Sequence, residues 1–327
     1  MAALPRITLV ATGGTIAGLA PAGAGAFEYQ AGALAAEALL QALPQAGELA
    51  RLGSETLFSL DSKDLEPTHW LRLIARLRDL LAQPEVDGIV VTHGTDTLEE
   101  TACALDLCLP RGKPVILTAA MRPASAPGAD GPLNLLQAIR AAATPELGAC
   151  GPLVAAGDRL WRARDIGKRH THAVDALGAF AEGPLGLFRG TALHLGASPT
   201  AAAALFSDAL PERLPWVDIL PGYAGAAPSL IDAAVADGAE GLVLALAGHG
   251  SVPERWLPAL ARAAARVPVV RASRIPAGGV WPQANFDDAA HGLIAAGSRS
   301  AWQARVLLSF GLARGLGKDA LAGLFAT

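Results

Sequence analysis

Short apolar runs alternate with longer amphipathic segments along the first half of the chain. Residues 6–11 and 87–91 predict buried strands, whereas residues 67–82 and 97–109 predict helices. Further strands are expected over 55–60 and 114–118, and further helices over 33–43 and 132–143. Strands that alternate with helices in this way are typical of an α/β fold with a mainly parallel sheet.

The alternation stops at residues 196–215, which are rich in Ala, Pro and Ser, and then returns. Beyond them, strands are expected over 241–247 and 268–271, and helices over 253–265 and 301–313. The chain is therefore predicted to form a larger N-terminal domain with a mainly parallel sheet and a smaller C-terminal α/β domain. The predicted boundaries are 1–196 for the catalytic domain, 197–214 for the linker and 215–327 for the C-terminal domain.

Composition excludes several classes of protein. A hydrophobic fraction of 52% is too high for a disordered chain, and a net charge of −4 predicts no nucleic-acid surface. No apolar stretch approaches the ~20 residues of a membrane span, and the first residues do not resemble a secretory leader. Three cysteines, Cys103, Cys108 and Cys150, are expected to be buried and unpaired. These features favour a cytoplasmic protein without a membrane partner.

Polar residues gather where the predicted strands end. Thr12-Gly13-Gly14-Thr15 follows the first strand, and its two glycines permit a sharp turn close to a ligand. Thr15 is either a nucleophile or a residue that caps the turn. Residues 18–32 follow it and include Tyr29. Their Gly and Ala content favours a mobile lid, with an ordinary surface loop as the alternative.

A second hydroxyl follows the strand at 87–91. Thr95 stands next to Asp96 at the predicted start of a helix, where backbone amides stabilise negative charge. The alternative is a helix cap without chemistry, since residues 97–100 match a capping box. His93 is expected to support the turn and not to catalyse. Two more polar clusters, at 61–64 and 120–123, also follow strands, so all four are expected at one edge of the sheet.

These motifs carry a resemblance to a known family. They read ATGGTIAG (11–18), DSKDL (61–65), VTHGTDTLEETA (91–102), AMRPASAPGADGPLNLLQA (120–138), RDIGKRHTHAVDA (164–176) and ASRIPAGG (272–279). In this order they resemble the signature stretches of bacterial-type L-asparaginases and glutaminase-asparaginases. The resemblance covers essentially the whole chain.

The resemblance implies hydrolysis of the side-chain amide of asparagine, and often of glutamine, through an acyl-enzyme on a threonine. The catalytic residues implied are Thr15 as nucleophile, Tyr29 beside it, and a triad of Thr95, Asp96 and Lys168. Ser62 would hold the α-carboxylate of the substrate and Asp96 its α-ammonium. This chemistry needs neither a metal nor an organic cofactor, and His170 and His172 alone are weak support for a metal site. The family also implies a homotetramer built as a dimer of dimers, with active sites at the tight dimer interface.

Some positions depart from the family pattern. Lys63 stands where the family usually has Gln or Glu, and Asn285 stands where a glutamate of a neighbouring subunit commonly reaches the α-ammonium. Ser251, a further candidate substrate residue, lies within the family's variation, but His249 is less usual. If Lys63 and Asn285 face the substrate, recognition of an α-amino acid weakens. The alternative is that Lys63 pairs with Asp61 or Asp64.

The sequence thus predicts conversion of L-asparagine to L-aspartate and ammonia. Three other interpretations stay open. One is a broad glutaminase-asparaginase, or a hydrolase of another small amide. A second is a catalytically silent amino-acid-binding protein on the same fold. The third, an amidotransferase subunit acting on mischarged tRNA, is disfavoured because the chain has no basic patch.

Overall fold

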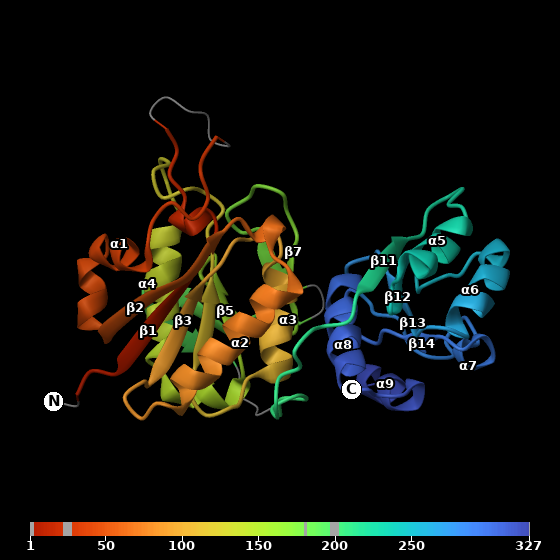
Figure 1. The fold of residues 1–327 in the computed structure, drawn as a ribbon. Helices are drawn as coiled ribbons and strands as arrows, with labels where there is room; N and C mark the ends of the chain where they lie inside the picture. The colour runs from red at the N-terminus through yellow and green to blue at the C-terminus, as the bar shows by residue number, and fades with distance from the viewer. Residues whose placement is uncertain (1–2, 22–27, 180–181, 197–202, 327) are drawn as a thin grey trace. The chain divides into compact units, whose positions relative to one another are not determined.

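The computed structural model describes residues 3–21, 28–179, 182–196 and 203–326. They fall into two compact units, Met1–Leu210 and Pro211–Thr327, which we call the N-terminal and C-terminal units and describe separately (Figure 1). The division lies inside the predicted linker 197–214, of which 197–202 are outside the described residues. Within the described ranges, no helix has the length and apolar character needed to cross a membrane.

An eight-stranded sheet forms the centre of the N-terminal unit. Its order is β10 (Ala192–Leu195), β9 (Gly186–Arg189), β6 (Arg159–Arg162), β5 (Leu153–Ala156), β4 (Val115–Thr118), β3 (Gly88–Thr92), β1 (Arg6–Gly13) and β2 (Arg51–Leu60). From β5 to β2 every pairing is parallel, whereas β6, β9 and β10 extend the sheet in antiparallel fashion. A separate antiparallel pair is made by β7 (Ile166–Lys168) and β8 (Leu177–Ala179). The predicted mainly parallel sheet is confirmed.

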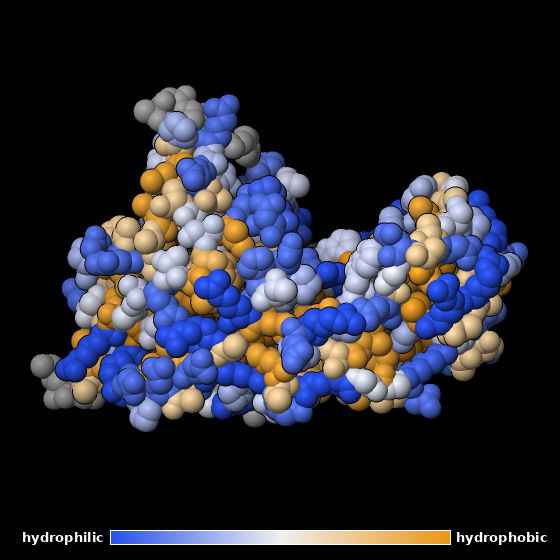
Figure 2. All heavy atoms as spheres, in the orientation of Figure 1, coloured by the Kyte–Doolittle hydropathy of each residue, from blue (hydrophilic) through white to orange (hydrophobic). Residues whose placement is uncertain are grey.

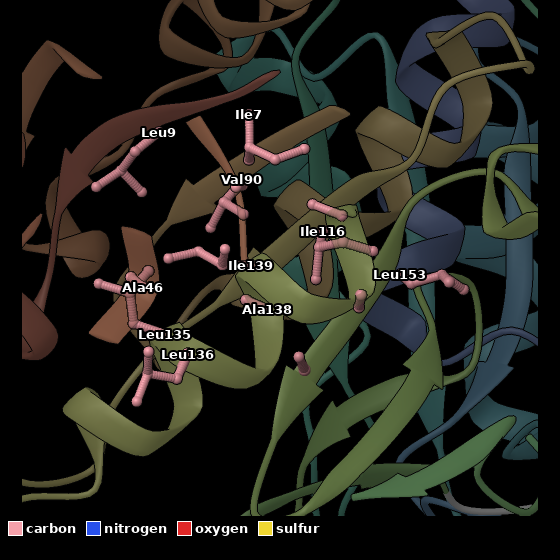
Figure 3. Packing of buried hydrophobic residues seen from close by; sticks show 14 of the residues in the cluster. Ile7, Leu9, Ala46, Val90, Ile116, Leu135, Leu136, Ala138, Ile139 and Leu153 are labelled. Carbon is pink, nitrogen blue, oxygen red and sulfur yellow. The ribbon is translucent and has the colours of Figure 1, made fainter. Parts of the chain in front are cut away.

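Helices cover both faces of this sheet (Figure 1). α1 (Ala36–Gln41) and α4 (Gly131–Ala142) lie on one face, and α2 (Pro67–Ala82) and α3 (Leu98–Cys108) on the other. Figure 3 shows the core between the sheet and α4, in which strand residues meet helix residues: Ile7, Leu9, Val90 and Ile116 with Leu135 and Ile139. Each fully buried side chain of this size contributes about 1.5–3 kcal/mol, so this layer fixes the sheet and the loops at its ends.

Local differences from the predicted elements have physical reasons. The helix expected over 67–82 is confirmed, but α1 begins only at Ala36, because Ala35 is extended and offers no side-chain cap. The expected capping box at Thr97 is wrong: the Thr97 hydroxyl donates to the Ser62 carbonyl oxygen at 2.8 Å instead of capping α3. Four short 3-10 helices complete the described part of the unit: η1 (Thr15–Ala17), η2 (Pro44–Glu48), η3 (Ser62–Asp64) and η4 (Pro145–Cys150).

The C-terminal unit is built on a four-stranded parallel sheet. Its order is β11 (Val217–Pro221), β12 (Gly241–Leu246), β13 (Val269–Ser273) and β14 (Ile294–Ala295). α8 (Ala301–Ala313) packs against the first three strands, and α5 (Ser229–Asp237) packs with α6 (Leu257–Ala264). The remaining helices are η5 (Glu254–Trp256), α7 (Asp288–His291) and α9 (Lys318–Phe325). A core around Leu242, Leu244 and Trp256 holds α5 and α6 in place. On the outer surface, polar side chains are interspersed with apolar ones (Figure 2).

Candidate active site

Glycines bring two of the predicted loops into contact at the carboxyl ends of the parallel strands. Gly13 and Gly14 at the end of β1 have φ angles of 103° and 80°, which residues other than glycine rarely adopt. A Cβ atom on Gly14 would overlap the backbone of Gly94, which follows β3, and one on Gly94 would overlap the Ser62 side chain. The loops that carry Thr15, Thr95 and Ser62 therefore pack directly against one another, as expected for one edge of the sheet.

The first hydroxyl of the site is that of Thr15, at the start of η1 (Thr15–Ala17). Its side chain is buried, and its Oγ1 lies 2.7 Å from the hydroxyl of Tyr29, which is half-buried. Residues 22–27 of the expected lid, Phe27 included, lie outside the described residues, so the lid stays a prediction. The contact gives Thr15 a hydrogen-bonding partner within proton-transfer distance.

The second hydroxyl, that of Thr95, is bound to a lysine. Lys168 on β7 donates from Nζ to Thr95 Oγ1 at 3.0 Å and to Asp96 Oδ1 at 2.5 Å. Thr95 is buried, and the Lys168 side chain is one-fifth exposed. The three predicted triad residues thus form one hydrogen-bonded chain, although Lys168 stands 73 residues after Thr95 in the sequence.

Ser62 and Lys63 lie on η3, beside this chain. Ser62 Oγ accepts a hydrogen bond from the Asp96 backbone N–H at 3.2 Å. The Lys63 ammonium donates to Asp61 at 2.6 Å and to Asp64 at 3.2 Å, and its side chain is 61% exposed. The hydrogen bond to Asp61, followed by that to Asp64, raises the pKa of Lys63. The structure thus places Lys63 in the ion pairs that were one of the two alternatives.

Ser251 and Asn285, the other two predicted substrate residues, belong to the C-terminal unit. Asn285 Oδ1 accepts from Arg271 Nη1 at 3.3 Å and lies 3.2 Å from His249 Nδ1. His249 Nε2 accepts from the Trp281 backbone N–H, so its proton resides on Nδ1 and is donated to Asn285. Ser251 is exposed and its backbone N–H closes a turn onto Ala247 at 2.9 Å.

Two buried polar groups next to the Thr95 loop have shifted pKa values. His93 is fully buried, and burial lowers its pKa to about 4. Glu99 in the first turn of α3 is 7% exposed, and burial, with a smaller contribution from Glu100, raises its pKa to about 8. The imidazole and the carboxyl group are therefore both uncharged near neutral pH.

Sequence reasoning missed the partners of His93. Thr101 Oγ1 of α3 lies 2.9 Å from His93 Nε2, and Trp70 Nε1 of α2 donates to Thr101 Oγ1 at 3.0 Å. His93 Nδ1 lies 2.7 Å from the Gly94 carbonyl oxygen. The one signal in the sequence is Trp70 itself, because a tryptophan on the buried face of an amphipathic helix needs an acceptor for its indole N–H.

A buried ion pair in the C-terminal unit was missed as well. Arg271 on β13 binds Asp288 of α7 with two hydrogen bonds of 2.7 Å, and both side chains are almost completely buried. Arg271 also donates to the carbonyl oxygens of His249, Gly250 and Trp281. Its position inside an apolar strand pattern gave no sign of this role.

His170 and the cysteines have structural surroundings. His170 Nδ1 accepts the backbone N–H groups of His172 and Ala173, so this nitrogen stabilises a turn. Over the described part of the chain, no group of three or more His, Cys, Asp or Glu side chains is arranged to hold a metal ion. All three cysteines are buried, as expected.

Comparisons with known proteins bear on the whole chain. The family model described as "Asparaginase, N-terminal" matches residues 6–201, and "Glutaminase/Asparaginase C-terminal domain" matches residues 216–325. The chain is 38% identical to L-asparaginase 2 of Bacillus subtilis, with 95% of this chain and 83% of that protein covered. It is 36% identical to L-asparaginase 2 of Escherichia coli, with 95% and 89% covered.

A second kind of relative and a solved structure extend the comparison. The glutaminase-asparaginase of Acinetobacter glutaminasificans is 34% identical, with 94% of this chain and 95% of that protein covered. The crystal structure of a probable cytoplasmic L-asparaginase from Campylobacter jejuni superimposes with a TM-score of 0.92 at 33% identity, with 98% and 99% covered. The family resemblance found in the motifs is confirmed, and the chain belongs to the asparaginase family.

Proposed function

We propose that the protein hydrolyses the side-chain amide of L-asparagine to L-aspartate and ammonia through an acyl-enzyme on Thr15. The observation that carries the proposal is the pair of buried threonine hydroxyls on adjoining loops, each with its own proton-transfer partner. Thr15 has Tyr29 at 2.7 Å, and Thr95 has Lys168 at 3.0 Å. A threonine hydroxyl is a weak nucleophile unless such a partner takes its proton.

In the first half-reaction Thr15 Oγ1 forms a bond to the amide carbon, and its proton passes to the leaving nitrogen by way of Tyr29. The carbon–nitrogen bond then breaks, which releases ammonia and leaves an ester on Thr15. In the second half-reaction the oxygen of water forms a bond to the ester carbon, and the bond from that carbon to Thr15 Oγ1 breaks. Thr15 regains its proton from the new carboxyl group, and aspartate leaves as the carboxylate. Backbone N–H groups of the adjoining loops would stabilise the negative oxygen, a contribution of about 3–4 kcal/mol per donor in serine hydrolases.

Lys168 supplies the proton relay at Thr95. As an ammonium it donates two hydrogens, one to Thr95 and one to Asp96. Loss of one ammonium proton to solvent leaves a neutral amine, which is able to accept the proton of Thr95, while Asp96 keeps its negative charge. Thr95 in turn is able to take a proton from the attacking water.

Substrate recognition is proposed from the remaining predicted residues. The Ser62 hydroxyl accepts from Asp96 N–H and keeps its own proton for the α-carboxylate of the substrate. Asp96 is half-exposed and retains an oxygen for the α-ammonium. The Lys63 charge is offset by Asp61 and Asp64. Asn285 and Ser251 are proposed to bind the substrate, as the family resemblance implies. The same resemblance supports a homotetramer as the assembly. The sparse and odd number of cysteines, three in the whole chain, favours a reducing compartment such as the cytoplasm.

A broader amide specificity is the second candidate. It is favoured by the 34% identity to a protein named glutaminase-asparaginase over almost the whole of both chains. Both candidates share the nucleophile and differ in the substrates accepted.

The test is ammonia release from the purified protein with L-asparagine, L-glutamine, D-asparagine and simple amides. Rapid release from L-asparagine that is lost in both Thr15→Ala and Thr95→Ala supports the proposal. Thr15→Ser and Thr95→Ser keep the hydroxyl and are expected to retain partial activity. Thr144→Ala, which removes a hydroxyl bonded to the Arg140 carbonyl oxygen at the end of α4, controls for general destabilisation.

Two results would overturn the proposal or parts of it. Turnover confined to another amide would leave the nucleophile and exclude L-asparagine as the substrate. No release from any amide would make an amino-acid-binding protein the better interpretation.

Addition of hydroxylamine separates formation of the acyl-enzyme from its hydrolysis, because an acyl-enzyme on Thr15 yields a hydroxamate and Thr15→Ala does not.

A further inference from the structure

Four buried groups form a hydrogen-bonded chain that ends on the loop of Thr95. Trp70 Nε1 lies 3.0 Å from Thr101 Oγ1, Thr101 Oγ1 lies 2.9 Å from His93 Nε2, and His93 Nδ1 lies 2.7 Å from the Gly94 carbonyl oxygen. Thr101 and His93 are completely buried, and Trp70 is 5% exposed. We call these residues the Trp70 relay. It connects α2 and α3 to the loop that follows β3.

The two ends of the relay fix its direction. An indole N–H is only a donor, so Thr101 Oγ1 must accept from Trp70. A backbone carbonyl is only an acceptor, so His93 Nδ1 must carry the proton that it donates to Gly94. His93 Nε2 is then an acceptor, and it receives the single hydroxyl proton of Thr101. Every group in the relay is satisfied in this arrangement, and the imidazole is the neutral Nδ1–H tautomer.

The bond to Gly94 also orients the next amide. In a planar trans peptide, the carbonyl of Gly94 and the N–H of Thr95 point in opposite directions. The carbonyl is held toward the buried ring of His93, so the Thr95 N–H points away from that ring. Gly94 packs directly against Gly14, the residue before Thr15. Within the described part of the chain no acceptor is bonded to the Thr95 N–H, although Thr95 is only 6% exposed.

We propose that His93 is a positioning residue: the Trp70 relay holds and polarises the Gly94–Thr95 peptide so that the Thr95 N–H is aimed at the carbonyl oxygen of the substrate amide. The inference rests on the proposed amide hydrolysis. Hydrogen bonds arranged in series polarise one another, so donation to the Gly94 oxygen strengthens the Thr95 N–H as a donor. A donor held in place before the reaction stabilises the transition state without reorganisation.

Burial supports this assignment. It lowers the pKa of His93 to about 4, so the ring stays neutral where amide hydrolysis is assayed. A protonated ring would donate from both nitrogens, and Thr101 would then have to accept from both Trp70 and His93. The observed contacts and the neutral ring therefore agree.

The tautomer is tested first, in the full-length protein without substrate. Histidine is labelled with ¹⁵N, and the His93 signals are identified by their loss in His93→Gln. The expected spectrum at neutral pH shows a protonated Nδ1 and an unprotonated Nε2. A proton on Nε2, or on both nitrogens, would overturn the relay.

The effect on catalysis is tested at Thr101. Thr101→Val keeps the shape of the side chain and removes the hydroxyl, so Nε2 loses its donor and the tautomer is no longer fixed. We expect kcat for amide hydrolysis to fall about 10- to 100-fold while KM changes less than about 3-fold, because the lost interaction acts in the transition state. Thr101→Ser is expected to restore most of kcat. An unchanged kcat in a folded Thr101→Val protein would show that the relay only stabilises the fold.

A second pair of variants covers the case in which Thr101→Val does not fold. His93→Asn keeps a donor near the position of Nδ1, whereas His93→Gln keeps a polar group near Nε2. We expect His93→Asn to retain the higher kcat, and the reverse order would contradict the proposal. The proposed reaction fails separately, since full activity in Thr15→Ala would reject it while the NMR result on the tautomer would stand.

Discussion

The two units stabilise the loops at the ends of their strands with opposite chemistry. In the N-terminal unit, both buried titratable groups beside the Thr95 loop are uncharged at neutral pH, His93 because burial lowers its pKa and Glu99 because burial raises its pKa. In the C-terminal unit, Arg271 and Asp288 form a buried ion pair with two hydrogen bonds of 2.7 Å. A buried ionisable group is tolerated in either way, by loss of its charge or by pairing.

The difference separates two kinds of vulnerability. Removing one member of a buried ion pair leaves an uncompensated charge, whereas removing a neutral hydrogen-bonding group leaves only an unsatisfied donor or acceptor. For a group that is neutral in the folded chain, the contribution to the free energy of unfolding depends instead on pH, because the same group ionises in the unfolded chain. The C-terminal unit should therefore be the more sensitive to substitution at its polar centre, and the N-terminal unit to pH.

The largest effect is expected at Arg271. Arg271→Met removes the partner of Asp288 and the donors to three carbonyl oxygens, so the free energy of unfolding of the C-terminal unit should fall by about 3–5 kcal/mol. Denaturant unfolding, with hydrogen exchange of β13 as a local probe, measures the loss. The double variant Arg271→Met with Asp288→Leu should recover much of it, because no charge remains buried. If Arg271→Met were nearly neutral, pairing would not be what holds these loops.

A smaller effect, and one of opposite origin, is expected at Glu99. In the folded chain Glu99 holds its proton up to about pH 8, whereas in the unfolded chain it loses it near pH 4.5. Stability is therefore lost as the pH rises between these values. His93, with a pKa of about 4 when folded and near 6.5 when unfolded, makes a contribution of the opposite sign, which rises with pH mainly below 6.5 and is nearly constant above pH 7. From pH 6.5 to 8 the Glu99 contribution should fall by about 2 kcal/mol.

Glu99→Gln tests this slope, since the neutral amide does not titrate. The free energy of unfolding, measured from pH 6.5 to 8, should become flatter in Glu99→Gln and stay unchanged in the control Glu85→Gln, whose side chain is exposed. A Glu99→Gln protein with the same pH slope as the parent chain would show that Glu99 is ionised in the folded state. The contrast between the two units would then be lost.

The sequence could predict the features that depend on local pattern, and it could not predict contacts between distant residues. Parallel strands put their carboxyl ends at one edge, so the meeting of the Thr15, Ser62 and Thr95 loops followed from the alternation of strands and helices. The antiparallel strands β6, β9 and β10 did not follow, because runs of four residues carry too little periodicity. Trp70 and Thr101 are far apart in the sequence, as are Arg271 and Asp288, and only the tertiary structure brings each pair within hydrogen-bonding distance. Their partners are not encoded in local spacing.

The smallest effect is expected at the surface, where a charge is neither buried nor lost. Lys63 is 61% exposed and bound by both Asp61 and Asp64. Solvent and these two carboxylates screen its ammonium, so Lys63→Gln should change KM for L-asparagine less than about 2-fold. A sharper test removes the two carboxylates that pair with Lys63. Asp61→Asn with Asp64→Asn leaves Lys63 unpaired beside Ser62, and KM should then rise, whereas adding Lys63→Gln to that double variant should bring it back. A marked fall of KM in Lys63→Gln alone would mean that the lysine repels the substrate amine in spite of its carboxylate partners.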